Sequence, residues 1–283
     1  MRKYQVLFAA FVLVFTVPLF LQSPAKAEEG NGVKDWTFLV FLNGKNSLDS
    51  FGALDINEME KVGSTDKINV LVQWASTSNH KTQRLYVQKD NDPNRVTSPV
   101  VQDMGSVDMG DWRSLVEFVQ WGVANYPAKH YFIDVWDHGS GWHLNSGGFS
   151  PRDISWDDDT GHFMTTKQLG QALAEAAKAI GHKVDLYGSD ACLMGMAEVA
   201  GEMSNSVEFS VGSEETEPGE GWPYDGLLSR WSALPTASAS DVAKILTTEY
   251  VKSYQGGSQG KSEVTFSAFD LSKLNKVSFA VKV

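Results

Sequence analysis

The segment YFIDVWDHGSGW, residues 131–142, combines an apolar run with a reactive end. Residues 131–136 are aromatic or aliphatic except for Asp134, which is typical of a strand buried on both faces of a parallel sheet. The run passes directly into Asp137, His138 and Gly139. The segment therefore predicts a central strand whose carboxyl end carries a histidine.

Similar apolar runs alternate with amphipathic segments along the chain. Further buried strands are predicted over residues 36–42, 68–74, 184–188, 209–212 and 264–269, with a hairpin over residues 83–87 and 100–104. Helices are predicted over residues 49–62, 111–123, 165–181, 193–203 and 240–254. This alternation predicts an α/β fold with a mainly parallel sheet flanked by helices on both faces. The polar stretch 139–161 is expected to be a long connection.

Composition excludes several classes of protein. A chain of 283 residues, 42% hydrophobic and 11% aromatic, has enough apolar area for a full core, so it is not intrinsically disordered. Its formal net charge of -11 argues against nucleic acid as a partner. The single cysteine, Cys192, excludes an intrachain disulfide.

The two ends of the sequence carry different signals. Basic residues precede an apolar run over residues 6–21, and Ala25 and Ala27 form a small-x-small cleavage site. We therefore predict a secretory signal peptide over residues 1–27, cleaved after Ala27, and a leader over residues 28–35. The mature chain is then secreted, periplasmic or at the cell surface, with no stable membrane insertion; an uncleaved anchor is the alternative, although the run is short for a span. The chain stops without a helix C-cap signal, which suggests a C-terminal truncation.

His138 and Cys192 follow two consecutive strands of the parallel sheet. Ligands bind beyond the carboxyl ends of such strands, so both side chains are expected at one edge of the sheet. Histidine can take a proton from a thiol and return it to a leaving amine. The glycine after His138 leaves its backbone N–H open to a developing oxyanion. Cys192 is accordingly either a nucleophile or a small buried apolar residue.

The segments WDHGSGW (136–142) and GSDACLMG (188–195) resemble motifs of the clostripain family of cysteine peptidases, which share a caspase-like fold. The aspartates at 157–159 and the segment 213–224 also fit, and the likeness extends from about Trp36 to the C-terminus. The resemblance implies a caspase-like peptidase domain over residues 36–283. It implies His138 as general base, Cys192 as nucleophile, and an oxyanion hole from the backbone N–H groups of Gly139 and Cys192.

The resemblance also implies a substrate class. Family members cleave after Arg or Lys, and an aspartate two residues before the cysteine, here Asp190, lines the specificity pocket. The alternative is that Asp190 caps the turn after its strand. Peptides or proteins with basic residues are the expected partners. Two other functions stay open, a catalytically silent binding module and a transpeptidase, because hydrolysis and transfer share a thioacyl-enzyme.

Arg152 is the only basic residue other than histidine between His138 and Lys167. Relatives in the family are processed between the histidine and the cysteine, so the resemblance makes Arg152 a candidate self-processing site of a zymogen. The alternative is that Arg152 balances the charge of neighbouring aspartates.

Two groups of acidic residues have open interpretations. Asp153, Asp157, Asp158 and Asp159 either bind calcium, as in some relatives, or form a solvated loop; their spacing is not that of an EF-hand. No other cofactor or metal is expected. The second acidic group consists of Glu214, Glu215, Glu217 and Glu220. It either faces basic substrates or belongs to an ordinary solvated loop.

Overall fold

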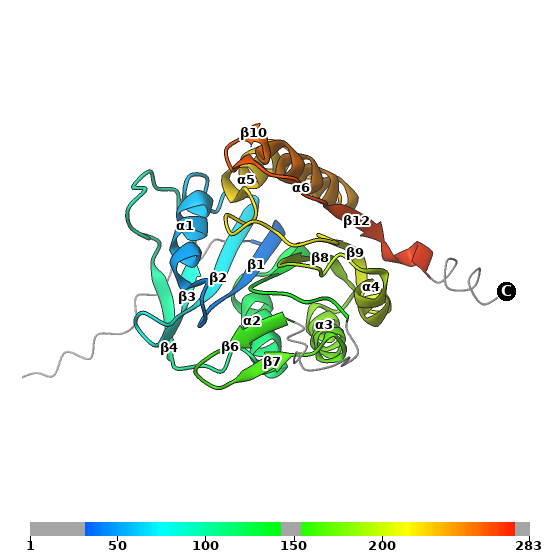
Figure 1. Cartoon of the computed structure of the whole chain (residues 1–283), viewed down its shortest axis with the longest axis horizontal. Helices are drawn as coiled ribbons and strands as arrows, with labels where there is room; N and C mark the ends of the chain where they lie inside the picture. The colour runs from blue at the N-terminus through cyan, green and yellow to red at the C-terminus, as the bar shows by residue number, and fades with distance from the viewer. Residues whose placement is uncertain (1–31, 143–153, 275–283) are drawn as a thin grey trace, which may run out of the picture.

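A computed structural model describes residues 32–142 and 154–274 of the chain (Figure 1). Its main feature is an eight-stranded sheet with the order β12-β9-β8-β5-β1-β2-β3-β4. The strands of this sheet are β1 (Lys34–Gly44), β2 (Ile68–Ser76), β3 (Lys81–Tyr86), β4 (Val100–Gly105), β5 (Ala128–Trp136), β8 (Val184–Asp190), β9 (Val207–Gly212) and β12 (Ser267–Asp270). Strands β2, β1, β5, β8 and β9 are parallel, and the strands outside them are antiparallel.

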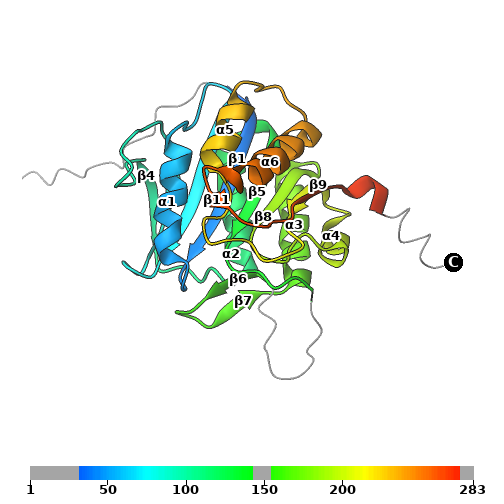
Figure 2. The same ribbon diagram turned by 45° about the horizontal axis from the view of Figure 1, so that its top comes forward.

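Helices cover both faces of the sheet (Figures 1 and 2). One face carries α1 (Asp49–Glu60), α5 (Tyr224–Ser232) and α6 (Ala239–Ser253), and the other carries α2 (Trp112–Asn125), α3 (Thr166–Ile180) and α4 (Ala197–Met203). Two short hairpins, β6 (Ile154–Asp157) with β7 (His162–Met164) and β10 (Gln255–Gly257) with β11 (Gly260–Lys261), and the 3-10 helix η1 (Leu271–Lys273) complete the described elements. This arrangement confirms the predicted α/β fold.

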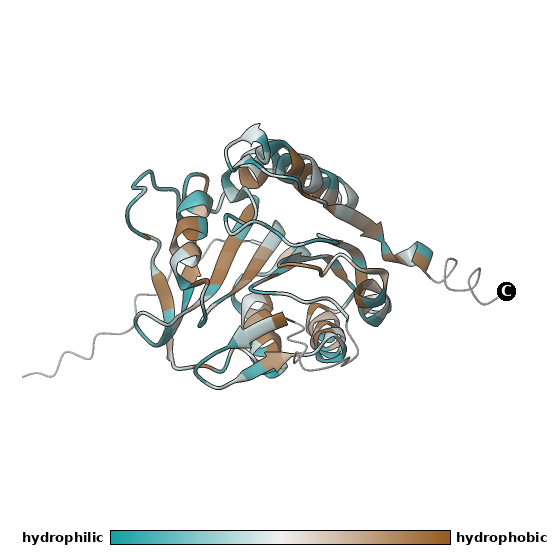
Figure 3. Cartoon of the chain, in the orientation of Figure 1, coloured by the Kyte–Doolittle hydropathy of each residue, from teal (hydrophilic) through white to brown (hydrophobic). Residues whose placement is uncertain are grey.

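The central strand β1 shows why long apolar runs predict this architecture. Phe38 and Val40 pack into the core under α1, α5 and α6, whereas Leu39 and Phe41 pack into the core over α2, α3 and α4. Successive side chains point to opposite faces, so a strand covered on both sides is largely apolar along its whole length. Figure 3 shows the hydrophobic residues concentrated on the central strands and on parts of the helices that pack against them.

Capping residues set several helix boundaries. Asp111 caps α2 by accepting the backbone N–H of Arg113 at 3.0 Å. Thr165 and Gln168 form a reciprocal capping box at the start of α3, which ends at Gly181 with a φ of 91°. A second capping box at Ser238 begins α6. These side chains satisfy backbone groups that the first and last helical turns leave unpaired.

The structure differs from the sequence prediction where tertiary hydrogen bonds compete with helix formation. Helix α4 begins at Ala197, four residues later than predicted. The backbone N–H of Leu193 donates to Glu215, that of Gly195 donates to Ser213, and Leu193 adopts a left-handed φ of 63°. The left-handed φ puts Leu193 outside the helical range, and the bonds to Ser213 and Glu215 hold residues 193–195 in this non-helical conformation. Helix α5 was not predicted, and the last strand is the shorter, antiparallel β12.

The polar stretch 139–161 was predicted to be a connection, but residues 154–157 within it form a strand. Residues 154–157 form β6, in which Ile154, Ser155 and Asp157 are buried. Ser155 donates from Oγ to the carbonyl oxygen of Met109 at 2.8 Å and adopts a φ of 56°. Internal hydrogen bonds therefore allow polar residues to occupy the core here. Within the two described ranges, no helix is long and apolar enough to cross a membrane.

Candidate active site

The parallel register of β5 and β8 brings the segments of His138 and Cys192 together. Trp136 of β5 pairs with Asp190 of β8. His138 comes two residues after Trp136, and Cys192 comes two residues after Asp190. The backbone N–H of Asp137 donates to the carbonyl oxygen of Asp190 at 3.2 Å. A Cβ atom on Gly139 would lie 2.3 Å from the carbonyl oxygen of Cys192. The backbones of the two segments are thus in direct contact, and only glycine fits at position 139.

His138 is half-buried and is held by neighbours on both sides. Its backbone N–H donates to Asp137 Oδ1 at 2.6 Å, and its ring nitrogen Nε2 lies 2.8 Å from Ser47 Oγ. The Asp137 side chain is buried and also accepts Nδ2–H of Asn46 at 2.6 Å and of Asn43 at 3.1 Å. Burial raises the pKa of Asp137 well above its usual range, while these donors oppose that shift.

Cys192 is a free, half-buried thiol. The backbone N–H of Glu217 donates to its Sγ at 3.2 Å. The Sγ atom also lies 3.9 Å from the carbonyl oxygen of Glu217. The thiol is therefore held against the backbone of Glu217.

Buried carboxyl groups lie close to Cys192. Asp190 is 5% exposed, and its Oδ2 accepts the backbone N–H of Trp222 at 3.1 Å. The Tyr224 hydroxyl lies 2.9 Å from Asp190 Oδ2 and 2.7 Å from Asp134 Oδ2. Burial raises the pKa of Asp190 to about 6 and that of Asp134 well above its usual range. One phenolic proton cannot serve two carboxylates fully, which favours protonation of one of them.

Glu217 has the least compensated carboxyl group of the site. Both of its oxygens are covered, no N–H or hydroxyl donor on the described residues reaches them, and their neighbour is a second carboxyl group, that of Asp190. Burial and the neighbouring charge of Asp190 raise the pKa of Glu217 well above its usual range. The four glutamates predicted to form one acidic group have different environments. Glu214, Glu215 and Glu220 are exposed, whereas the carboxyl group of Glu217 is covered.

The aspartates after β6 do not form one solvated loop. Lys45 is fully buried, and its Nζ lies 3.4 Å from Asp157 Oδ2 and 3.4 Å from Asp159 Oδ2. Asp157 also accepts the backbone N–H of Met109 at 2.9 Å. Asp157 is thus a structural counterion for Lys45. Among the described residues, no group of three or more His, Cys, Asp or Glu side chains could hold a metal ion. Calcium binding stays a prediction from the resemblance.

Some predicted features lie outside the described residues. These are the signal peptide over residues 1–27, the first half of the leader, the candidate processing residue Arg152 and the acidic residue Asp153.

Sequence reasoning also missed functional candidates. Ser47 follows β1 as one polar residue among several, and nothing in its local pattern indicates contact with His138. The Glu217 contact with Cys192 joins residues 25 positions apart, which only the folded chain reveals.

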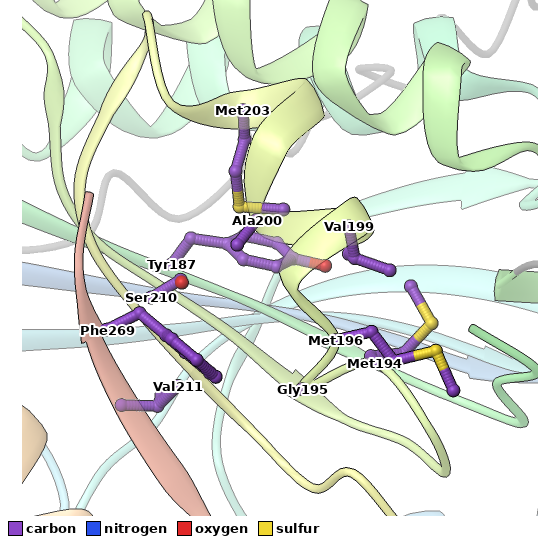
Figure 4. A pocket seen from close by; sticks show the side chains of 10 residues that line it. All are labelled: Tyr187, Met194, Gly195, Met196, Val199, Ala200, Met203, Ser210, Val211 and Phe269. Carbon is purple, nitrogen blue, oxygen red and sulfur yellow. The ribbon is translucent and has the colours of Figure 1, made fainter. Parts of the chain in front are cut away.

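A small apolar cavity of about 10 Å³ lies next to the segment that follows Cys192 (Figure 4). Tyr187, Phe269 and the three methionines Met194, Met196 and Met203 line it. Its apolar lining and small size do not suit a peptide side chain with a positive charge. The cavity is a packing defect under α4, separate from the acidic residues close to Cys192.

Known proteins are similar to this chain over most of its length. The model of the clostripain family matches residues 40–283. Clostripain from Hathewaya histolytica is 29% identical over 227 residues, which cover 70% of this chain and 42% of clostripain. The chain therefore spans less than half the length of this relative.

Solved structures of C11 cysteine proteases have the same fold. A secreted C11 cysteine protease from Bacteroides thetaiotaomicron, in complex with an irreversible peptide inhibitor, has a TM-score of 0.69 and 24% identity, over 88% of this chain and 70% of that chain. An inactive zymogen C11 protease from Parabacteroides distasonis has a TM-score of 0.66 and 22% identity, over 88% of this chain and 65% of that chain. This likeness confirms the predicted caspase-like α/β fold.

We expect Glu217→Gln to stabilise the protein increasingly as the pH rises from about 5 to 8. The folded chain keeps the pKa of Glu217 raised, whereas the unfolded chain ionises near the ordinary value. The folded state therefore binds more protons in this range and loses stability as the pH rises. Glutamine does not titrate and removes that loss. Thermal unfolding midpoints of both proteins across this range measure the difference.

The matched control is Glu202→Gln, because Glu202 is exposed. Its unfolding midpoint should differ from that of the wild type by the same amount at every pH. A constant difference for Glu217→Gln as well would contradict the effect of burial on this carboxyl group.

Proposed function

Because the chain belongs to the clostripain family, we propose that it is a cysteine endopeptidase that hydrolyses peptide bonds after Arg or Lys. The observation that carries this proposal is the contact of the Gly139 backbone with Cys192 at the carboxyl edge of the sheet. That contact joins the segments that carry His138 and Cys192, and a backbone N–H of Glu217 donates to the sulfur. The arrangement suits nucleophilic acyl transfer.

The proposed reaction has two halves. His138 takes the proton of the Cys192 thiol, and the thiolate attacks the scissile carbonyl carbon. The resulting oxyanion faces the backbone N–H groups of Gly139 and Cys192. His138 then gives its proton to the leaving amine, the C–N bond breaks, and a thioacyl-enzyme remains. In the second half, His138 takes a proton from water, the hydroxide attacks the thioester, the C–S bond breaks to release the carboxylic acid product, and the proton on His138 returns to the Cys192 sulfur.

The preference for basic residues is supported by the charge close to the nucleophile. Asp134, Asp190 and Glu217 are buried there, and none of them forms an ion pair with a described Lys, Arg or His side chain. A guanidinium or ammonium group of the substrate would supply the missing positive charge through charge-assisted hydrogen bonds. Because Asp190 is almost fully covered, the substrate side chain has to open its contacts with Trp222 and Tyr224.

Transpeptidation is the alternative that the same site supports. A thioacyl-enzyme reacts with an amine as well as with water, and His138 can deprotonate either. Product analysis with and without an added amine nucleophile distinguishes the two reactions. The presence of both His138 and Cys192 disfavours a catalytically silent binding module.

The proposed location is outside the cytoplasm, as a mature peptidase domain over residues 36–283. This rests on the signal pattern in residues 1–27, and one structural relative is described as a secreted protease. N-terminal sequencing of the exported protein should give Glu28 as the first residue.

We expect Cys192→Ala to abolish peptide hydrolysis and covalent labelling by a thiol-reactive peptide inhibitor, because the nucleophile is gone. His138→Ala should lower kcat/KM roughly 10²–10⁴-fold by removing the general base. His80 is exposed and provides a matched control. Its backbone has a left-handed φ of 52°, which asparagine adopts readily. His80→Asn should therefore retain activity. Near-full hydrolysis by Cys192→Ala would contradict the proposed mechanism.

We expect Asp190→Asn to reduce the preference for Arg and Lys more than it reduces folding stability. The substitution removes a negative charge but keeps the size of the side chain and an acceptor for the Trp222 N–H. In the wild type, the preference should also weaken as the pH falls through about 6, where Asp190 takes up a proton. The measurement is the ratio of kcat/KM for matched Arg and Leu peptides. An unchanged ratio would show that Asp190 only orders the segment around Trp222.

We also propose self-processing after Arg152. The described residue nearest to this position, Ile154, pairs with Gly139 of the site, so the chain just beyond Arg152 reaches the catalytic edge. Mass spectrometry of the purified wild type should show two fragments that meet after Arg152, and both Arg152→Ala and Cys192→Ala should stay intact. Active wild type in one piece, or a Cys192→Ala protein cut there without added protease, would overturn this proposal.

A further inference from the structure

A serine from a different strand end contacts the proposed general base. Ser47 lies in the connection between β1 and α1, and its Oγ is 2.8 Å from Nε2 of His138. β1 is the parallel neighbour of β5, so both strands end at the same edge of the sheet. Ser47 itself is exposed, and no apolar packing explains its position. Its contact with the imidazole ring is therefore the feature that needs an explanation.

The connection that carries Ser47 is fixed by buried neighbours. Asn46 is 7% exposed and donates from Nδ2 to Asp137 Oδ1 at 2.6 Å and to the carbonyl oxygen of Trp156 at 2.9 Å. Its Oδ1 accepts the backbone N–H of Leu48 at 2.9 Å. Asn46 thus ties the residue before Ser47 to the segment that carries His138, and it also holds the backbone of Leu48 on the other side. This arrangement holds the hydroxyl in place without a large loss of loop entropy.

We propose that Ser47 is a positioning residue for His138 and that its hydroxyl oxygen accepts a hydrogen bond from Nε2–H. Nδ1 is then the atom that exchanges a proton with Cys192. In that step the S–H bond breaks, an Nδ1–H bond forms, and the products are a thiolate and an imidazolium whose Nε2–H still donates to Ser47. The inference rests on the proposed function, because it assigns a role within that dyad.

The chemistry of a hydroxyl group suits this position. An imidazolium has two N–H donors, and an acceptor on the second one stabilises the charged form. A carboxylate would do so more strongly, but it would add a second negative charge close to Asp137. The opposite arrangement, in which Ser47 donates to Nε2, holds the tautomer that cannot accept the thiol proton at Nδ1. The two arrangements predict opposite effects when the hydroxyl is removed.

The test compares Ser47→Ala, Ser47→Thr and the wild type. We expect Ser47→Ala to lower kcat on an Arg peptide roughly tenfold, with KM changed by less than about twofold, as for a lost hydrogen bond to a charged group. Ser47→Thr keeps the hydroxyl and should retain most of kcat. Ser50→Ala, at an exposed serine in the first turn of α1, is the matched control and should match the wild type. Thermal unfolding midpoints should be the same for all four proteins.

Alkylation by iodoacetamide gives a second readout that needs no peptide substrate. The reagent reacts with the thiolate, so its rate with Ser47→Ala near neutral pH should fall with kcat. If the wild type cleaves no peptide but its alkylation still depends on the Ser47 hydroxyl, the proposed function fails and this inference stands. The inference is overturned if Ser47→Ala keeps the wild-type kcat and alkylation rate, if either rate rises, or if Ser47→Thr is as slow as Ser47→Ala.

Discussion

A side chain at position 139 would collide with the carbonyl oxygen of Cys192, and the rest of the candidate site depends on this close approach. The approach is possible because β5 and β8 run parallel with Trp136 opposite Asp190, so their carboxyl ends finish level with each other. Polar groups help to fix that register, because the backbone N–H of Asp190 donates to Asp134 Oδ1 at 3.2 Å and that of Asp137 donates to the carbonyl oxygen of Asp190 at 3.2 Å. A shift by one residue would break both hydrogen bonds, so these bonds hold the two segments at their present distance.

The polar residues around His138 form a closed network, in contrast to the acidic residues close to Cys192. Asn43, Asn46 and Asp137 are buried, and each has hydrogen-bond partners of good geometry. A satisfied buried network is rigid, because any movement would leave a polar group without a partner in a medium of low dielectric constant. Rigidity is what a general base requires, since proton transfer depends strongly on distance and direction.

The elements that local sequence could predict are those whose environment is uniform along the chain. Residues 131–136 are apolar apart from Asp134 because the strand is covered on both faces. Thr165 with Gln168 indicates a helix start by chemistry local to four residues. The failures occur where the deciding partner is distant in sequence. Leu193 is withheld from a helix by Glu215, and β6 is stabilised by residues such as Asn43 and Lys45. Contacts of that kind leave no periodic pattern in the sequence.

The carboxyl groups close to Cys192 show where stability and function diverge. A fold selected only for stability would pair Glu217 with a donor or replace it, because an unpartnered buried carboxyl costs free energy at neutral pH. The chain instead places it next to Asp190 and joins its backbone to the sulfur of Cys192. Under the proposed function, the missing partner is the positive charge of the substrate. The negative charge of these acidic residues would then be balanced only when a basic side chain is bound. Because the backbone of Glu217 contacts Cys192, the residue that recognises the substrate side chain would also contact the nucleophile.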